Sequence, residues 1–372
     1  MPPLPARLAR SPQWRDGRFR NPRPPVNGSM LRATREFFFG GSPHRKPDAP
    51  VPVVPRVAAD YGTPPASGLR VTWLGHSTAL LEIDGRRVLI DPVWAEHVGP
   101  VPVYAPKRFY PPPLPLAELP PVDVVLLSHD HYDHLHERTI RALAARGDRF
   151  VAPLGVGAHL ARWGVLEERI TECDWWEQVA LDRLTLTATP ARHFSGRRVV
   201  DNDRTLWCGW AIAGPAHRVL YAGDTALHES FAEIGARLGS FDLTMIEAGA
   251  YDALWADVHL GPEQAVRAHR LLGGGGVMLP VHWGLFDLAL HGWTEPAERV
   301  LVAAAADEVR VTLPRPGAMV EPTVHAPAER WWPEVPWKTA AEAPVRSTGT
   351  EHLMDPSVAS DLLPRENSQR FG

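Results

Sequence analysis

The sequence has little cysteine, no surplus of positive charge and no long apolar run. Its 372 residues include two cysteines, Cys173 and Cys208, which lie far apart and form no C-x-x-C motif. Such a chain does not depend on disulfides, so we expect it to work in the reducing cytoplasm. No apolar run reaches the ~18 residues of a membrane-spanning helix. Arg7 and Arg10 are not followed by an apolar segment, so we expect no secretory signal peptide.

The charge balance and the length set further limits. The formal net charge is −4, whereas proteins that bind nucleic acid carry clustered positive charge. We therefore expect no nucleic-acid partner. A chain of this length buries a large core in one domain or two.

Proline, by contrast, is abundant, and its distribution divides the chain. Residues 1–68 are rich in Pro, Arg and Gly, which predicts an irregular arm packed on the body. Within it, residues 30–39 are compatible with a short amphipathic helix. This segment ends in Phe37-Phe38-Phe39, which we assign to the core in preference to a membrane-facing or partner-facing patch. Residues 69–322 form the expected body, and residues 323–372 a C-terminal extension that is partly disordered, chiefly in its last ~25 residues.

From residue 69 onward, apolar or alternating segments predict strands that alternate with helices. The expected strands cover residues 70–74, 78–83, 87–90, 122–127, 151–153, 184–188, 206–213, 218–222, 243–247 and 277–281. The expected helices cover residues 137–145, 159–163, 229–238, 262–272 and 295–306. This order is typical of an α/β domain.

The most informative stretch, residues 128–134, reads Ser-His-Asp-His-Tyr-Asp-His and follows the apolar residues 124–127. Three imidazoles and two carboxylates are costly to place at the end of a buried strand. A divalent metal explains that cost, because Zn²⁺ accepts neutral histidine nitrogens and aspartate oxygens as ligands. The alternative, a solvated His-rich loop, does not explain why similar residues recur further along the chain.

The recurrence follows one plan, in which an apolar strand is followed by a ligand-type residue. It is repeated at His193, Asp224 and His282. Taken singly, a histidine at such a position is more often structural than a ligand. Several strand ends that converge on one edge of a sheet are, however, the usual way in which sheet proteins build a site.

The H-x-H-x-D-H motif, a later single histidine, Gly223-Asp224-Thr225 and a final histidine at a strand end resemble the metallo-β-lactamase-fold hydrolases. The resemblance implies an αβ/βα sandwich, two mixed β-sheets flanked by helices on both outer faces. It also implies two Zn²⁺ ions with seven ligands: His129, His131 and His193 for the first, Asp133, His134 and His282 for the second, and Asp224 between them. The same ligand types also suit Mn²⁺ or Fe²⁺.

A narrower resemblance, to the N-acylphosphatidylethanolamine-hydrolysing phospholipase D family, rests on short motifs spread along the chain. They cover residues 17–22, 73–78, 91–92, 131–135, 223–225, 241–243, 249–251, 259–266 and 282–284. The resemblance implies phospholipase D-type cleavage of N-acylphosphatidylethanolamine or a related phospholipid, by attack of a metal-bridging hydroxide on phosphorus. Residues 255–258 depart from the family pattern.

Five further roles are weaker expectations. Asp133 is a ligand that also orients the nucleophile or accepts its proton, and His259 contacts phosphate or assists the leaving group. The alternative for His259 is a surface histidine that precedes a helix. Asp91 hydrogen-bonds a ligand histidine or is only an Asp-Pro turn residue, and His76 supports the site or is an ordinary buried histidine. Tyr132 projects from the metal loop toward substrate.

Two other functions are alternatives to the phospholipase hypothesis. One is a lactonase-like hydrolase of a small sugar-phosphate ester, and the other is a non-catalytic, metal-binding protein associated with a membrane. The mixture of arginines and phenylalanines in the arm suits an anionic lipid surface, which predicts peripheral contact with the inner membrane face; the alternative is an ordinary solvated arm. The oligomeric state stays open, with a homodimer as one alternative.

Overall fold

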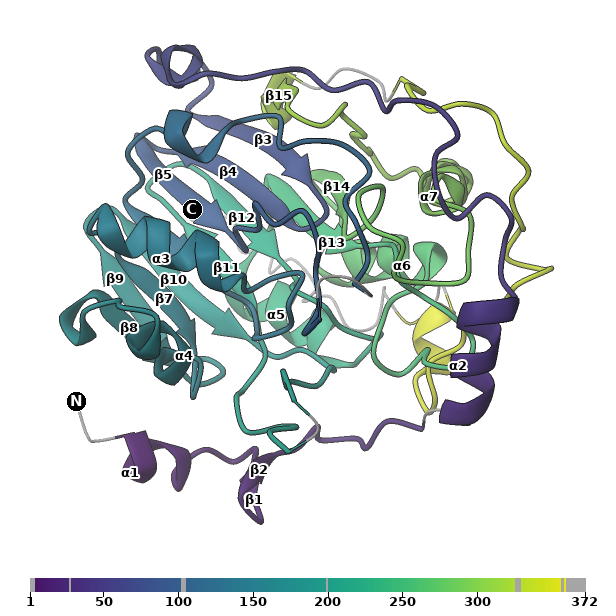
Figure 1. Cartoon of the computed structure of the whole chain (residues 1–372), viewed down its shortest axis with the longest axis horizontal. Coiled ribbons are helices and arrows are strands. Elements are labelled where there is room, and N and C mark those ends of the chain that lie inside the picture. The colour runs from purple at the N-terminus through teal and green to yellow at the C-terminus, as the bar shows by residue number, and fades with distance from the viewer. Residues whose placement is uncertain are drawn as a thin grey trace, which may run out of the picture.

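Two β-sheets stacked face to face form the centre of the protein, and helices cover both outer faces (Figure 1). This computed structural model describes residues 4–26, 28–101, 105–198, 200–324, 329–355 and 358. The predicted αβ/βα sandwich is confirmed. Among the described helices, none combines the length and the hydrophobicity needed to cross a bilayer.

The larger sheet has seven strands in the order β15-β3-β4-β5-β6-β7-β8. Its first half, β15 to β5, is antiparallel, and its second half, β5 to β8, is parallel. The strand bounds are Met319–Val320 (β15), Leu69–Gly75 (β3), Thr78–Ile83 (β4), Arg86–Ile90 (β5), Val124–Leu126 (β6), Phe150–Pro153 (β7) and Ile170–Cys173 (β8).

The smaller sheet has six strands in the order β14-β13-β12-β11-β10-β9. Strands β12, β13 and β14 run parallel, whereas β9 to β12 are antiparallel to their neighbours. Strand β10 therefore points the same way as β12, β13 and β14. The bounds are Val277–Val281 (β14), Leu243–Glu247 (β13), Arg218–Tyr221 (β12), Gly209–Ala213 (β11), Leu184–Thr189 (β10) and Gln178–Leu181 (β9).

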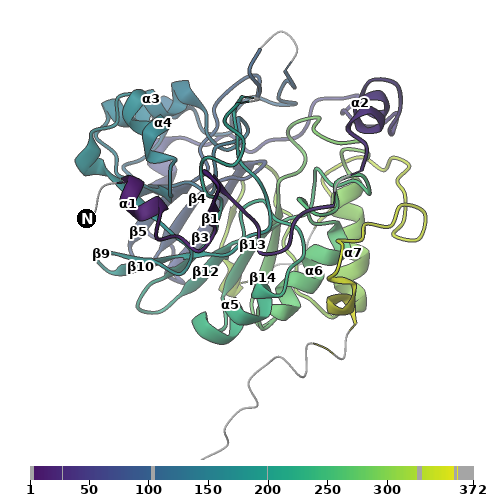
Figure 2. The same cartoon turned by 90° about the horizontal axis from the view of Figure 1, so that it is seen from below.

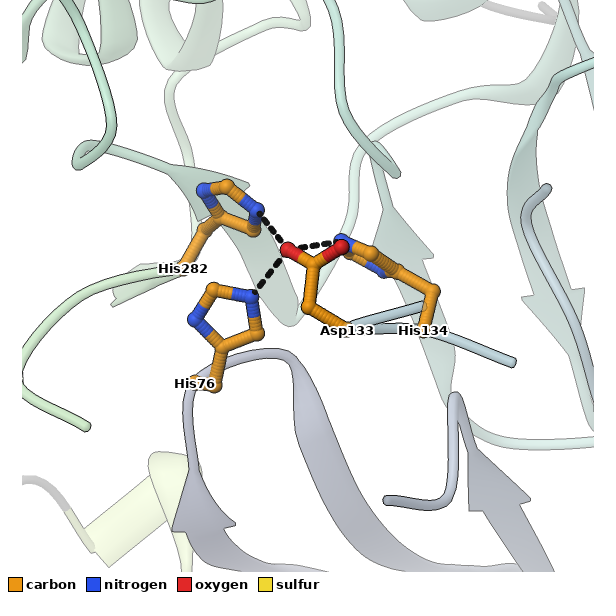
Figure 3. Close-up of side chains that lie close together, drawn as sticks. All are labelled: His76, Asp133, His134 and His282. Carbon is orange, nitrogen blue, oxygen red and sulfur yellow. Dashed lines mark hydrogen bonds and ion pairs between the residues drawn. The ribbon is translucent and has the colours of Figure 1, made fainter. Parts of the chain in front are cut away.

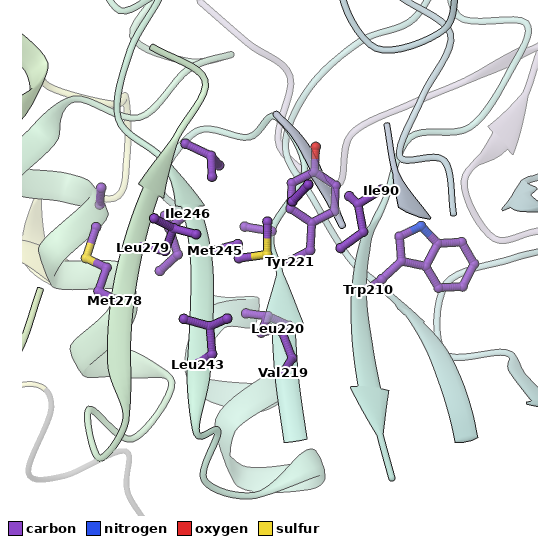
Figure 4. Packing of buried hydrophobic residues seen from close by; sticks show 14 of the residues in the cluster. Ile90, Trp210, Val219, Leu220, Tyr221, Leu243, Met245, Ile246, Met278 and Leu279 are labelled. Carbon is purple, nitrogen blue, oxygen red and sulfur yellow. The ribbon is translucent and has the colours of Figure 1, made fainter. Parts of the chain in front are cut away.

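Helices α3 (Glu137–Ala145) and α4 (Gly157–Arg162) lie on one side of the sandwich, and α5 (Ser230–Leu238), α6 (Pro262–Leu271) and α7 (Glu295–Ala306) lie on the other (Figure 2). The side-chain alternation of the strands explains both layers. In β4, Leu81 points into the main core between the sheets, whereas Leu80 packs outward with Ile140 of α3. Figure 4 shows the inner layer, including Met245 and Trp210.

Two buried polar contacts cross the sandwich next to the strand ends. The Trp210 Nε1 donates to the Leu127 carbonyl at 2.8 Å, and the Tyr221 hydroxyl donates to the Asp91 carboxylate. Both contacts join β11 or β12 to a strand end of the other sheet. Because they are fully buried, they hold the two sheets in one relative position.

The elements differ from the predicted ones mainly at the sheet margins. The strand expected over residues 206–213 begins only at Gly209, because the backbone N–H groups of Leu206 and Cys208 donate to the carbonyls of Leu154 and Ser128. Strands β8, β9 and β15 were not predicted. They are short edge strands with half-buried side chains, so they lack a strong apolar pattern.

The chain before β3 forms α1 (Leu4–Leu8), β1 (Trp14–Arg15), β2 (Arg18–Phe19), α2 (Met30–Phe39) and the 3-10 helix η1 (Ala58–Tyr61). It packs on the body through Phe19, which is fully buried and meets Trp14 edge-on. Residues 329–355 also pack on the body, with Trp332, Ser347 and Leu353 buried. The final residues expected to be disordered lie largely outside the described residues.

Burial of Phe19 yields a test of whether the arm is part of the folded body. We expect Phe19→Ala to lower the free energy of unfolding by about 3–5 kcal/mol, because a large aromatic side chain leaves a cavity. Chemical denaturation would measure the loss. Val302→Ala, at a position that is 58% exposed, is the control and should change stability by less than about 0.5 kcal/mol. Equal stability of the two variants would contradict the packed arm.

Candidate metal centre

The predicted ligands meet at one end of the sandwich. His129 to His134 follow β6 of the larger sheet, whereas His193, Asp224 and His282 follow β10, β12 and β14 of the smaller sheet. These three strands point the same way, so their C-terminal ends share one edge. His76 lies in the β3–β4 turn and Asp91 directly follows β5, at the same end.

Three histidine nitrogens form the first group. The Nδ1 of His131 lies 2.9 Å from the Nε2 of His129 and 3.2 Å from the Nε2 of His193. Lone pairs of neutral imidazoles do not attract one another, so this convergence needs a proton or a cation. Tetrahedral Zn–N bonds of 2.0–2.1 Å place ligand nitrogens about 3.3 Å apart, which is close to the spacing found.

The second group surrounds the Asp133 carboxylate (Figure 3). Its Oδ2 lies 2.8 Å from the Nε2 of His76, 3.3 Å from that of His282 and 3.5 Å from that of His134. All four side chains supply ligand-type atoms within 4.8 Å of one another. The group therefore contains the three residues assigned to the second metal, together with His76.

Asp224 lies between the two groups. Its Oδ2 is 3.1 Å from the Nε2 of His134 and 3.0 Å from that of His282, and it is 3.8 Å and 3.9 Å from the Nε2 atoms of His129 and His193. Its Oδ1 is buried without a hydrogen-bond partner among the described residues. A bridging position between two cations would satisfy this carboxylate, which otherwise bears an uncompensated desolvation cost.

The electrostatics also favour bound cations. Burial lowers the pKa of His282, but the Asp224 and Asp133 carboxylates outweigh burial and raise it to about 10. Burial raises the pKa values of Asp133 and Asp224, but the neighbouring histidines pull both well below the usual range. In the absence of metal, protons on His134 and His282 thus balance the two carboxylates, and divalent ions would replace those protons.

Two ligand histidines are held in a defined tautomer. The Nδ1 of His134 donates to Asp91 at 2.7 Å, and the Nδ1 of His193 donates to the carbonyl of Val258 at 2.7 Å. In both rings Nε2 is left to bind a metal, which is the usual function of such supporting hydrogen bonds. Asp91 also accepts from the backbone N–H and hydroxyl of Ser128, as expected for a buried supporting carboxylate.

Three of these residues sit in a strained backbone conformation. His76, Asp91 and His282 have φ values of 54°, 37° and 64°, in the left-handed region that residues with a Cβ seldom adopt. Each lies immediately after a strand, where the turn aims the side chain at the site. Such strain persists only where the surrounding contacts impose it.

The remaining predicted residues lie around the centre. The Nε2 of His76 donates to Asp133 and so orients this carboxylate. The His259 ring is centred 5.0 Å from the His193 ring and 5.3 Å from the His282 ring. The Tyr132 hydroxyl donates to the Arg197 carbonyl at 2.9 Å, and the Arg197 guanidinium covers the Tyr132 ring. Tyr132 therefore ties the metal loop to the segment that follows His193.

Glu247 is a site residue that we did not predict. This fully buried residue ends β13. Its Oε2 lies 2.8 Å from the Nδ1 of His259 and 3.7 Å from that of His282, while its Oε1 accepts from the Thr225 N–H. Burial raises its pKa. The signal was present in the sequence, because Glu247 is a carboxylate at the C-terminal end of an apolar strand, near the position where the ligands stand on other strands.

Asn21 of the arm is a second residue that we missed. Its Nδ2 donates to the His193 carbonyl at 2.7 Å, and its Oδ1 accepts from the His193 N–H at 3.2 Å. The side-chain amide thus holds the backbone of a predicted ligand from a position 172 residues away. Asn21 lies within the arm motif of residues 17–22, which was the only sequence signal.

Comparison with known families and structures identifies the superfamily of the chain. The family described as the beta-lactamase superfamily domain matches residues 86–283, so the chain belongs to this superfamily. An uncharacterized protein of Mycobacterium tuberculosis is 47% identical over 332 residues, which are 87% of each chain.

A second relative narrows the family. The N-acyl-phosphatidylethanolamine-hydrolyzing phospholipase D 1 of Caenorhabditis elegans is 32% identical over 293 residues, covering 75% of this chain and 82% of the relative. The chain therefore belongs to the family of this phospholipase, and it is a metal-dependent hydrolase. The isothiocyanate hydrolase from Delia radicum gut bacteria superposes with a TM-score of 0.55 at 20% identity, over 68% of this chain and 98% of that chain. At this identity the likeness shows the fold alone.

The position of Asp224 predicts the metal content. We expect the purified protein to bind two equivalents of Zn²⁺, and Asp224→Asn to weaken at least one of them by about tenfold or more, because a bridging ligand loses its charge. Elemental analysis after dialysis would measure the stoichiometry. Asp355→Asn, at an exposed position, should retain both equivalents. An unchanged zinc content in Asp224→Asn would contradict the bridging role.

The Asn21 contact predicts that the arm supports the metal centre. We expect Asn21→Ala to weaken zinc binding by about tenfold, since supporting contacts to ligands typically contribute that much. Competition with a chromophoric chelator would measure the affinity. Asn202→Ala is the control, because this exposed asparagine meets the arm through its backbone carbonyl. Equal zinc affinity of the two variants would show that Asn21 is dispensable.

Proposed function

We propose that the protein is a dinuclear zinc phosphodiesterase that cleaves N-acylphosphatidylethanolamine or a related phospholipid with phospholipase D regiochemistry. The observation that carries the proposal is the pair of His/Asp groups that share Asp224. The relationship to a phospholipase D that hydrolyses N-acylphosphatidylethanolamine supports the substrate class.

Two divalent ions bound here would acidify a water molecule and neutralise charge on the phosphoryl oxygens. The chain's own residues do the positioning. The Nε2 of His76 holds Asp133 from one side at 2.8 Å, so that its carboxylate is placed to orient the attacking water or to accept its proton. The water oxygen would add to phosphorus, and the bond from phosphorus to the N-acylethanolamine oxygen would break.

His259 is suited to the leaving-group side of this reaction. Its Nδ1 is bound to Glu247, which leaves Nε2 for a phosphoryl oxygen or the departing alkoxide. The ring lies against those of His193 and His282, one from each predicted metal group. It is also half-buried rather than enclosed, so a substrate can reach it.

We further propose that the protein works in the cytoplasm, at the inner face of the membrane that holds its substrate. Both cysteines are buried and free, in keeping with a reducing compartment. A phospholipid substrate would have to be extracted from a bilayer, so peripheral membrane contact belongs to the proposal.

Turnover of a soluble phosphodiester tests the chemistry separately from lipid binding. We expect His131→Ala to reduce hydrolysis of bis(p-nitrophenyl) phosphate by about a thousandfold or more, because metal ions contribute several kcal/mol to transition-state stabilisation. His352→Ala, at an exposed position, should retain full activity. Unchanged turnover in His131→Ala would refute the proposed centre.

A substrate panel then decides between phospholipase and lactonase. The wild-type protein should release N-acylethanolamine from N-acylphosphatidylethanolamine and should leave a lactone and a β-lactam intact. In water enriched in ¹⁸O, the label should enter the phosphatidate and not the N-acylethanolamine, as attack at phosphorus requires. Preferred turnover of the lactone, or label in the alcohol, would overturn the assignment.

A further inference from the structure

Helix α2 turns apolar side chains toward solvent, whereas an ordinary surface helix turns them toward the core. Its N-cap Ser29 accepts a hydrogen bond from the Arg32 N–H, so the N-terminus of the helix is capped. Leu31, Arg35 and Phe39 are four residues apart and therefore share one face. Leu31 is 81% exposed and Phe39 is 87% exposed, and Arg35 between them is also exposed. Surface helices normally turn such an apolar stripe toward the core.

The other face of α2 contacts the body. Ala33, Glu36 and Phe37 are half-buried, and Arg45 fixes this face by donating to the Phe37 carbonyl at 2.7 Å while pairing with Asp287 at 2.8 Å. The orientation of the helix is therefore set by contacts on its inner side. Both Figure 1 and Figure 2 place α2 at the margin of the molecule, outside the two helical layers.

The charges on α2 and on the rest of the chain indicate which kind of surface the exposed face of α2 would bind. Arg32 and Arg35 are exposed on α2. Arg35 lies on the outward face, whereas Arg32 lines a groove on the inner side together with the half-buried Glu36, the acidic residue of the helix. The whole chain has a net charge of −4, so an anionic surface would repel most of the molecule and attract this margin. Exposed apolar side chains combined with arginine match the interface of an anionic bilayer.

A groove lies behind α2, on the inner side of the helix. It has a volume of about 1040 Å³, is lined by Arg32 and Glu36 of α2, and has apolar walls that include Leu254, Leu290 and Val345. A lipid that leaves the bilayer beside α2 would thus meet a partly apolar groove.

We infer that the outward face of α2, formed by Leu31, Arg35 and Phe39, docks the protein on a bilayer that contains anionic phospholipids. This deepens the proposed phospholipase function and rests on it for the identity of the substrate. The apolar side chains would enter the interface, and the guanidinium groups would stay at the level of the phosphates.

Vesicle cosedimentation of the full-length protein tests the inference without requiring turnover. We expect binding to phosphatidylcholine vesicles that contain phosphatidylglycerol, and at least about tenfold weaker binding to phosphatidylcholine alone, because each arginine near an anionic surface adds about 1 kcal/mol. The double variant Leu31→Asp/Phe39→Asp should lose about tenfold or more of the partition coefficient. Arg35→Glu should weaken binding only to the anionic vesicles.

Matched controls separate docking from folding and from catalysis. Leu166→Asp and Val302→Asp introduce the same charge at positions that are 61% and 58% exposed elsewhere on the protein, and both should bind vesicles like the wild type. The α2 variants should keep full turnover of bis(p-nitrophenyl) phosphate, two zinc equivalents and the wild-type melting temperature.

Three results would overturn the inference. They are a wild-type protein that binds neither vesicle, a double variant that binds as well as the wild type, and a double variant that converts a dimer to a monomer in solution without a change in vesicle binding. The last result would assign the face to a second copy of the chain. If the proposed phosphodiesterase activity is absent, the wild-type protein will fail to hydrolyse bis(p-nitrophenyl) phosphate. This result is distinct from a failure of docking, because the α2 variants should equal the wild type in that assay.

Discussion

The centre depends on one electrostatic constraint, the placement of two carboxylates, the buried Asp224 and the mostly enclosed Asp133, among five imidazoles. Asp133 and Asp224 cannot be desolvated at the end of a sandwich unless positive charge accompanies them. The strand directions bring His129, His193 and His282 to them from two sheets, and the cross-sheet bonds of Trp210 and Tyr221 hold those sheets in place. The fold thus determines where charge must be balanced, and the supporting contacts of Asp91 and the Val258 carbonyl determine which nitrogens of His134 and His193 are offered.

Much of this arrangement was predictable from sequence, for a physical reason. A ligand that follows an apolar strand is visible as a polar residue where burial would otherwise continue, and this pattern pointed to residues 128–134, His193, Asp224 and His282 at one edge. The choice of seven ligands among them came from the family resemblance. Long strands and helices such as β4, α3 and α7 were visible in the same way. Asn21 was not, because its role consists of two hydrogen bonds to a backbone 172 residues away. The edge strands β8 and β9 have only four residues each and bury few of them fully, so they are too short to give a periodic signal.

The arm has two distinct relationships to the body. Near residue 20 it is internal, since Phe19 is buried and Asn21 braces His193. Near residue 35 it lies at the margin and exposes large apolar side chains. The expectation that Phe37 to Phe39 belong to the core as one group is wrong for Phe39. The structure separates them, with Phe37 half-buried and Phe39 exposed, and the side chain of Phe38 lies outside the described residues.

The Asn21–His193 contact also constrains the order in which the chain can mature. During synthesis the arm is made first, yet its partner follows β10, and the last predicted ligand, His282, follows β14. Contacts of such long sequence separation form late in folding, because the loop between them must close first. The metal centre can therefore be completed only after nearly the whole domain has left the ribosome, and metal binding would act as a final check on a fully assembled chain.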